Sequence, residues 1–66
     1  MDDFERYLAE TLPPKDSLRL VKDAAARYAR AHTEAQCRQT GIALYASDNF
    51  QIQEVGVLLL GYAAHA

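Results

Sequence analysis

Residues 50–62 read FQIQEVGVLLLGY and carry the strongest structural signal in the chain. Apolar residues three or four positions apart form one stripe of a predicted helix: Ile52, Val55, Leu59 and Tyr62. Three further apolar residues fall largely outside that stripe: Phe50, Val57 and Leu60. A helix that is apolar on more than one side is normally buried on more than one side. We therefore predict that this second set is an interaction face, covered by another copy of the chain or, as we favour, by further repeats of a longer array.

The remainder of the chain has the same helical periodicity, and no stretch alternates at strand spacing for long. The pattern predicts four helices, at about residues 3–12, 16–31, 33–47 and 49–64. The predicted fold class is therefore all-α: one domain spanning residues 1–66, built as two antiparallel helical hairpins.

Local signals indicate where these helices begin and end. Pro13 and Pro14 separate the first two, because proline lacks the amide donor and restricts the residue before it. Asp16 or Ser17 is expected to cap the second helix. Thr33 and Gln36 have the spacing of a capping box at the start of the third. The fourth is expected to start at another cap-type residue, Asp48 or Asn49.

Apolar spacing also predicts which residues of the first three helices point inward. For the first helix these are Phe4, Tyr7, Leu8 and Leu12. For the second they are Leu18, Val21, Ala25 and Tyr28. For the third they are Ala35, Ile42 and Tyr45.

Units of seventeen residues, starting at positions 15, 32 and 49, match in character. Two sets of equivalent positions illustrate the match: Leu18, Ala35 and Ile52, and then Ala25, Ile42 and Leu59. Two such units would make a hairpin of about 34 residues, which is the scale of helical solenoids. The alternative is that three helices of similar length match by chance.

Composition restricts the function classes. Sixty-six residues make one small domain of marginal stability. Cys37 is the only cysteine, so no intrachain disulfide can form and a reducing, cytoplasmic location is expected. The longest apolar run, residues 57–60, is far too short to cross a bilayer, so we expect no membrane partner. A net charge of −2 argues against a general binder of polyanions.

No motif in the chain predicts catalysis, a metal site or a cofactor. The soft metal ligands lack the paired spacing of structural zinc: they are His32, Cys37 and His65. Cys37 is expected to be a small core residue rather than a nucleophile. The glycines are isolated and form no phosphate loop, and we expect them to mark close helix contacts: Gly41, Gly56 and Gly61.

Basic residues are concentrated on the second helix and the residue before it. Five of the seven lie there: Lys15, Arg19, Lys22, Arg27 and Arg30. They spread over less than half of the helix circumference, an arrangement that can follow a phosphate backbone. The candidate DNA-backbone contacts are Arg19, Lys22, Arg27 and Arg30. The alternative is the ordinary solvated face of an amphipathic helix, which Asp16 and Asp23 share.

About half of the chain, residues 33–60, resembles the HEAT-like helical repeats of the DNA alkylation repair family, which includes alkylbase DNA glycosylases. The similarity lies in the aliphatic–aromatic pair and small polar turn of residues 44–47 (LYAS), followed by residues 50–59 (FQIQEVGVLL). The resemblance implies the N-terminal segment of a HEAT-like solenoid that cradles double-stranded DNA. The family's catalytic acidic and aromatic residues, notably tryptophans, lie in later repeats, and this chain has no tryptophan. A tetratricopeptide-like hairpin is the alternative repeat, but its characteristic residues are out of register here.

Two functions are therefore expected from the sequence. The first is a scaffold segment of a DNA alkylation repair-type protein, with DNA backbone contacts and no catalytic activity by itself. The second is a small helical module that binds another protein or associates with itself.

Overall fold

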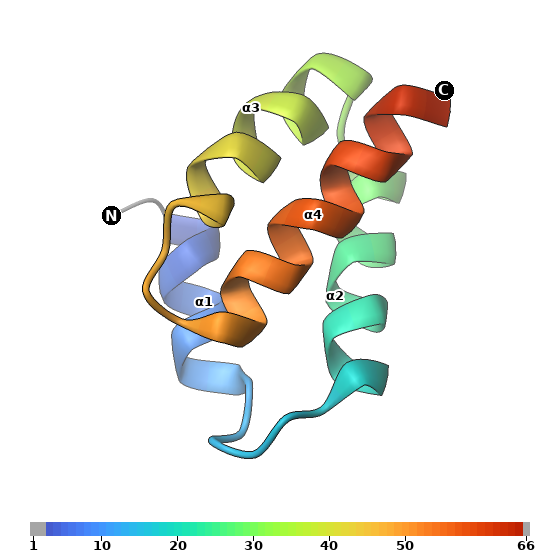
Figure 1. The fold of residues 1–66 in the computed structure, drawn as a ribbon. Helices are drawn as coiled ribbons and strands as arrows, with labels where there is room; N and C mark the ends of the chain where they lie inside the picture. The colour runs from blue at the N-terminus through green and yellow to red at the C-terminus, as the bar shows by residue number, and fades with distance from the viewer. Residues whose placement is uncertain (1–2, 66) are drawn as a thin grey trace.

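The computed structural model describes residues 3–65 and shows four helices and no strand in that range. The helices are α1 (Asp3–Thr11), α2 (Leu18–Ala31), α3 (Glu34–Tyr45) and α4 (Phe50–His65). In Figure 1, α3 and α4 lie side by side at the front, with α1 and α2 behind them. The all-α prediction is confirmed, and the observed helix ends differ from the predicted ones by at most two residues.

The starts of α3 and α4 are set by local hydrogen bonds. Thr33 and Gln36 form the predicted capping box: the Gln36 amide donates to Thr33 Oγ1 at 3.1 Å, and the Thr33 amide donates to Gln36 Oε1 at 2.9 Å. At the start of α4, Asn49 Oδ1 accepts from the amides of Gln51 and Ile52 at 2.9 and 3.2 Å. These side chains satisfy amides that have no partner within the helix.

The start of α2 is held differently. Ser17 occupies the N-cap position, but its side chain makes no capping hydrogen bond. Instead its backbone amide donates to Gln51 Oε1 at 3.0 Å, while Gln51 Nε2 donates to the carbonyl oxygen of Pro13 at 2.5 Å. The side chain of Gln51 thus ties the segment between α1 and α2 to the first turn of α4.

The core draws on all four helices and is centred on α4, which packs against each of the other three. Its buried side chains are Leu8, Val21, Ala25, Cys37, Leu44, Ile52, Val55 and Leu59. For Cys37 the predicted core position is confirmed, with an exposed fraction of 3 %.

The predicted inner face of α3 was wrong. Ile42 and Tyr45 are 60 % and 58 % exposed, and Ala35 is exposed as well. The residues of α3 that face the core are Cys37, Gly41 and Leu44. The helix is rotated relative to the prediction because a glycine, rather than a bulky apolar residue, lies where α3 meets α4.

Two of the three glycines mark that close contact. A Cβ atom at Gly56 would lie 2.7 Å from the carbonyl oxygen of Gly41 and 2.8 Å from the amide nitrogen of Tyr45. A Cβ at Gly41 would lie 2.9 Å from the carbonyl oxygen of Gly56. The backbones of α3 and α4 therefore touch. Gly61 has open space around it, so the predicted close contact there was wrong.

Burial also differs at positions that the seventeen-residue units make equivalent. Ile52 is buried, whereas Leu18 is 51 % exposed. Ala25 and Leu59 are fully buried, whereas Ile42 is on the surface. The matches in sequence character therefore do not correspond to matching positions in the core. Other residues predicted to face inward are about half exposed: Tyr7 (51 %) and Tyr62 (45 %).

Candidate functional site

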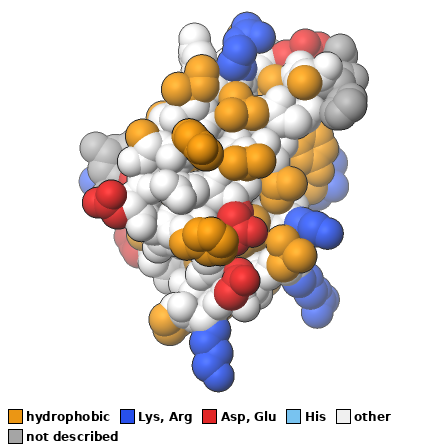
Figure 2. All heavy atoms as spheres, viewed as in Figure 1, with side chains coloured by type: hydrophobic (Ala, Val, Ile, Leu, Met, Phe, Trp, Pro, Cys, Tyr) orange, Lys and Arg blue, Asp and Glu red, His pale blue; other side chains and the backbone are white. Residues whose placement is uncertain are grey.

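Large apolar side chains gather on the outer side of α3 and α4, where Figure 2 shows hydrophobic surface facing the viewer. Four of them are 50 to 65 % exposed, and Leu60 beside them is partly buried. We call this surface the α3–α4 face, and it consists of Ile42, Tyr45, Phe50, Val57 and Leu60. Large exposed apolar patches commonly mark interaction sites.

The contact between Gly41 and Gly56 assembles this surface. Because the two backbones touch, side chains that flank the contact on α3 and α4 lie next to one another. Leu60 reaches across the junction, and its Cγ atom is 3.0 Å from the position that a Cβ of Gly41 would occupy. The α3–α4 face therefore draws on both helices.

The sequence identified part of this surface. Phe50, Val57 and Leu60 were predicted as an interaction face. The structure leaves Phe50 and Val57 exposed and Leu60 partly buried, and their role in binding stays a prediction. Ile42 and Tyr45 were missed because they were assigned to the core. The signal that would have found them is the spacing of Cys37, Gly41 and Leu44, which recur at intervals of four and three residues and include a glycine suited to close packing.

Two charged residues lie at this surface. Arg38 is exposed and lies one helical turn before Ile42, and no ion pair engages it within residues 3–65. Glu54 is half-buried and lies one turn from both Phe50 and Val57. Within the described residues, Glu54 Oε1 is buried and accepts no hydrogen bond. A buried acceptor without a partner is costly, and because this oxygen has almost no accessible surface, a donor from another molecule cannot reach it in this arrangement.

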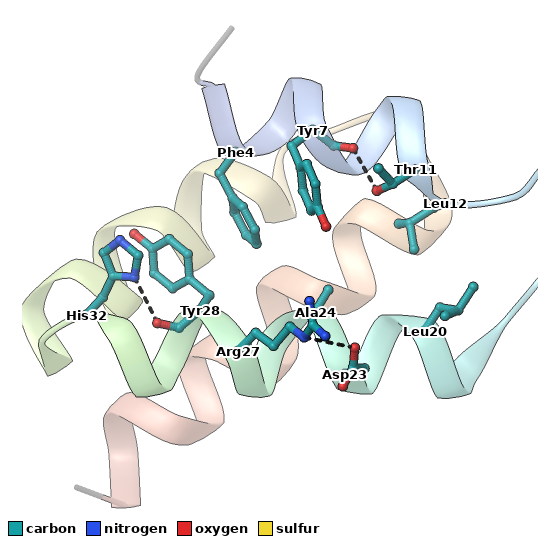
Figure 3. A pocket seen from close by; sticks show the side chains of 10 residues that line it. All are labelled: Phe4, Tyr7, Thr11, Leu12, Leu20, Asp23, Ala24, Arg27, Tyr28 and His32. Atoms are coloured by element: carbon teal, nitrogen blue, oxygen red, sulfur yellow. Dashed lines mark hydrogen bonds and ion pairs between the residues drawn. The ribbon is translucent and has the colours of Figure 1, made fainter.

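A groove of about 280 Å³ separates α1 from α2 (Figure 3). One pair of rings spans it, since the Phe4 centroid on α1 is 4.6 Å from that of Tyr28 on α2. Tyr7 lies beside Phe4 on α1 at 6.3 Å, and His32, just after α2, stacks on Tyr28 at 3.7 Å. The Tyr28 hydroxyl also bonds Thr40 Oγ1 on α3 at 2.7 Å. Ligand pockets usually enclose about 300 to 1,000 Å³, so this groove is slightly smaller than that range. Its rings chiefly hold α1 against α2.

The four basic residues of α2 that were predicted as DNA contacts are all exposed. They have different surroundings. Arg27 lines the groove, and its Nε lies 3.3 Å from Asp23 Oδ2. Lys22 lines a shallow hollow with Leu58 and Tyr62. Contact of Arg19, Lys22, Arg27 and Arg30 with DNA stays a prediction.

The described residues show neither a metal cluster nor a membrane span. Within them, no three side chains of His, Cys, Asp or Glu come together as a metal ion would require. The side chain of His65, one of the three candidate soft ligands, lies outside what the structure describes. None of the helices in the described range has both the length and the apolar character needed to span a bilayer.

No known family model, curated protein or solved structure matches this chain. The resemblance to HEAT-like repeats of the DNA alkylation repair family therefore stays a prediction. Among the surfaces of residues 3–65, the α3–α4 face holds four of the exposed large apolar side chains. It is therefore the strongest candidate for a functional surface.

Proposed function

We propose that this chain is a helical protein-interaction module that docks a partner through the α3–α4 face. The observation that carries the proposal is the exposure of Phe50 and Val57, 65 % and 50 %, on a helix whose opposite side forms the centre of the core. Covering apolar surface stabilises a complex by roughly 25 cal/mol per Å² removed from water, before the costs of association.

The form of the surface supports docking. The backbone contact between Gly41 and Gly56 holds the two helices in one geometry, which lowers the ordering cost of binding. Tyr45 and Phe50 are aromatic side chains, the type that often dominates interface energies when it enters a pocket of the partner. Charged groups around an apolar centre are typical of interfaces.

Site-specific photocrosslinking tests the proposal. Benzoylphenylalanine is placed at Val57, and at Gln39 as a matched control on an exposed position of α3 outside the face. We expect the chain to form covalent adducts with its partner through position 57 and none through position 39. The Ile42→Glu substitution should abolish the adducts formed through position 57. Circular dichroism verifies that each variant is helical. Equal crosslinking from both positions, or none from position 57, would contradict the proposal.

A second candidate follows from the exposed basic residues of α2. In this proposal the chain is a HEAT-like segment of a DNA alkylation repair-type protein, arranged as two antiparallel hairpins and contributing backbone contacts to double-stranded DNA without catalysis of its own. The exposure of Arg19, Lys22, Arg27 and Arg30 supports it.

Its test is binding to duplex DNA at several salt concentrations. Electrostatic contacts predict an affinity that falls steeply with salt and with the double reversal Arg19→Glu and Arg30→Glu. Reversal of Arg6, a basic residue of α1, is the matched control and is expected to have a smaller effect. Binding that does not depend on salt, or equal effects of both reversals, would remove this candidate.

A further inference from the structure

We infer that the hollow between α2 and α4 is a second docking site, and that it takes an acidic amphipathic helix of another protein. None of the residues that line this hollow belongs to the α3–α4 face. The inference therefore goes beyond the proposed function and does not depend on it. It is drawn from the open space around Gly61 and from the positions of the basic residues of α2.

The hollow offers a place for an apolar side chain. Its volume is about 450 Å³, and its lining consists of Lys22 on α2 and of Leu58, Gly61 and Tyr62 on α4. A Cβ atom at Gly61 would meet no other atom within 4 Å. Leu58 is half-buried and Tyr62 is 45 % exposed, so both present apolar surface beside this space. An apolar side chain of a partner can enter where Gly61 has none.

The basic residues of α2 fall into two groups with different neighbours. Arg27 lines the α1–α2 groove and pairs with Asp23. Arg19, Lys22 and Arg30 lie within about 80° of the helix circumference, on one edge of α2, and no ion pair engages them within residues 3–65. Three cations without a counter-charge thus follow this edge for about 16 Å.

This cationic edge borders the hollow. Lys22 lines the hollow itself, and Arg19 lines an adjoining hollow that shares Lys22 and Tyr62 with the first. Asp23, which also lines the adjoining hollow, is the partner of Arg27. On the α2 side of the view in Figure 2, Lys and Arg side chains lie next to hydrophobic ones. The site therefore combines an apolar space with positive charge along one side.

Charge and shape together select the occupant. α2 and α4 run in the same direction (Figure 1), and a groove between two helices accepts an amphipathic helix through its apolar face. Carboxylates along one flank of that helix would meet the three cations, while an apolar anchor enters beside Gly61. The backbone of duplex DNA could also meet the cations, but it offers no apolar group for the space beside Leu58. The observations therefore favour an acidic amphipathic helix.

Fluorescence anisotropy with designed peptides tests the inference on the full chain. The probe is a labelled, alanine-based helical peptide of about four turns, with leucine on one face and glutamate on the adjoining flank. Two matched peptides carry lysine in place of glutamate, or alanine in place of leucine. We expect saturable binding of the probe below about 1 mM, and binding about tenfold or more weaker for each matched peptide.

Variants of the chain test each half of the site. Lys22→Glu should raise the dissociation constant of the probe about tenfold or more, because it places like charges opposite one another. Gly61→Leu should raise it as much, because the new side chain fills the open space. Gly61→Ala and the exposed Arg38→Glu on α3 are the matched controls and should change it by less than about twofold. Circular dichroism verifies that every variant is helical.

Amide NMR shifts of the wild-type chain locate the bound probe without any substitution. Shift changes centred on Lys22, Gly61 and Tyr62 are expected. Changes centred instead on Ile42 and Val57 would overturn the inference while supporting the proposed function.

The remaining outcomes also decide the inference. It is overturned by the absence of saturable binding, by equal binding of the glutamate and lysine peptides, or by an unchanged affinity in Gly61→Leu. Binding of a DNA duplex that Lys22→Glu weakens and Gly61→Leu does not, without binding of the probe, would assign the cations to DNA and overturn the inference as well.

Discussion

Helices α3 and α4 meet backbone to backbone at Gly41 and Gly56, whereas α1 and α2 face each other across a groove of about 280 Å³ that the Phe4 and Tyr28 rings bridge. The difference follows from side-chain size where the helices approach. Glycine lets two backbones touch, while aromatic rings hold two helices apart and fill part of the space between them. Close packing in the first pair moves bulky residues such as Ile42 to its outer side.

This contrast separates two roles within one small chain. The α3–α4 pair is held by direct contact and presents an apolar surface outward. The α1–α2 pair relies on ring contacts and on the side chain of Gln51, which binds the connecting segment to α4. The effects of substitutions in the α3–α4 pair should therefore differ in size and kind from the effects of substitutions in the α1–α2 pair.

The largest effect is expected where the α3–α4 contact is broken. In Gly56→Ala the added methyl meets the carbonyl oxygen of Gly41 and the amide of Tyr45, backbone atoms that cannot move aside independently. We expect a loss of about 2 kcal/mol in the free energy of unfolding, within the range found for overpacked contacts. Urea unfolding followed by circular dichroism measures it.

Gly61→Ala is the control on the same helix, because its added Cβ meets no atom within 4 Å. The variant should gain up to about 1 kcal/mol from the higher helix propensity of alanine. Equal stabilities of the two alanine variants would show that the glycine contact does not hold the pair together.

The next largest effect is expected at the connection to the α1–α2 pair. Gln51→Met keeps the approximate shape of the side chain but leaves the Ser17 amide and the Pro13 carbonyl without their partner. Loss of these bonds should cost about 1.5 kcal/mol and should speed hydrogen exchange at the Ser17 amide. Gln39→Met, on an exposed position, should change stability by less than about 0.5 kcal/mol. Unchanged exchange at Ser17 would mean that the segment is held by other contacts.

A smaller loss of stability is expected from changes at helix N-caps, and it should differ between α3 and α2. Thr33→Ala removes the capping box of α3 and should cost about 1 kcal/mol. Ser17→Ala removes a hydroxyl that makes no capping bond at α2, so it should cost much less. Thermal unfolding of both variants measures the difference. A comparable loss in both would contradict the assignment of the caps.

The smallest effect is expected at the rim of the groove. Asp23→Asn removes the ion pair with Arg27, whose side chain is 68 % exposed beside a 56 % exposed carboxylate. Solvent and salt screen such a pair, so we expect a change of only a few tenths of a kcal/mol. The same unfolding measurement at low salt and in 1 M salt detects it. A loss above about 1 kcal/mol would contradict the screening of this exposed pair by solvent and salt.

The helices themselves could be predicted because their signals are local. Proline pairs, capping residues and apolar spacing act within a few residues of one another, so the four segments and the Thr33–Gln36 box needed no knowledge of the fold. Part of the α3–α4 face was predictable for the same reason. Phe50, Val57 and Leu60 are excess apolar residues on one helix, and their spacing alone sets them outside its main stripe.

What the tertiary structure alone decided is the rotation of α3 about its own axis. Periodicity on α3 allows more than one stripe, and the stripe with Ile42 and Tyr45 carries the bulkier side chains. The backbone contact of Gly41 with Gly56 selected the other stripe, since touching helices exclude bulky side chains from their junction. The local sequence therefore determined where this chain is helical, and long-range packing determined which residues of α3 lie on the surface.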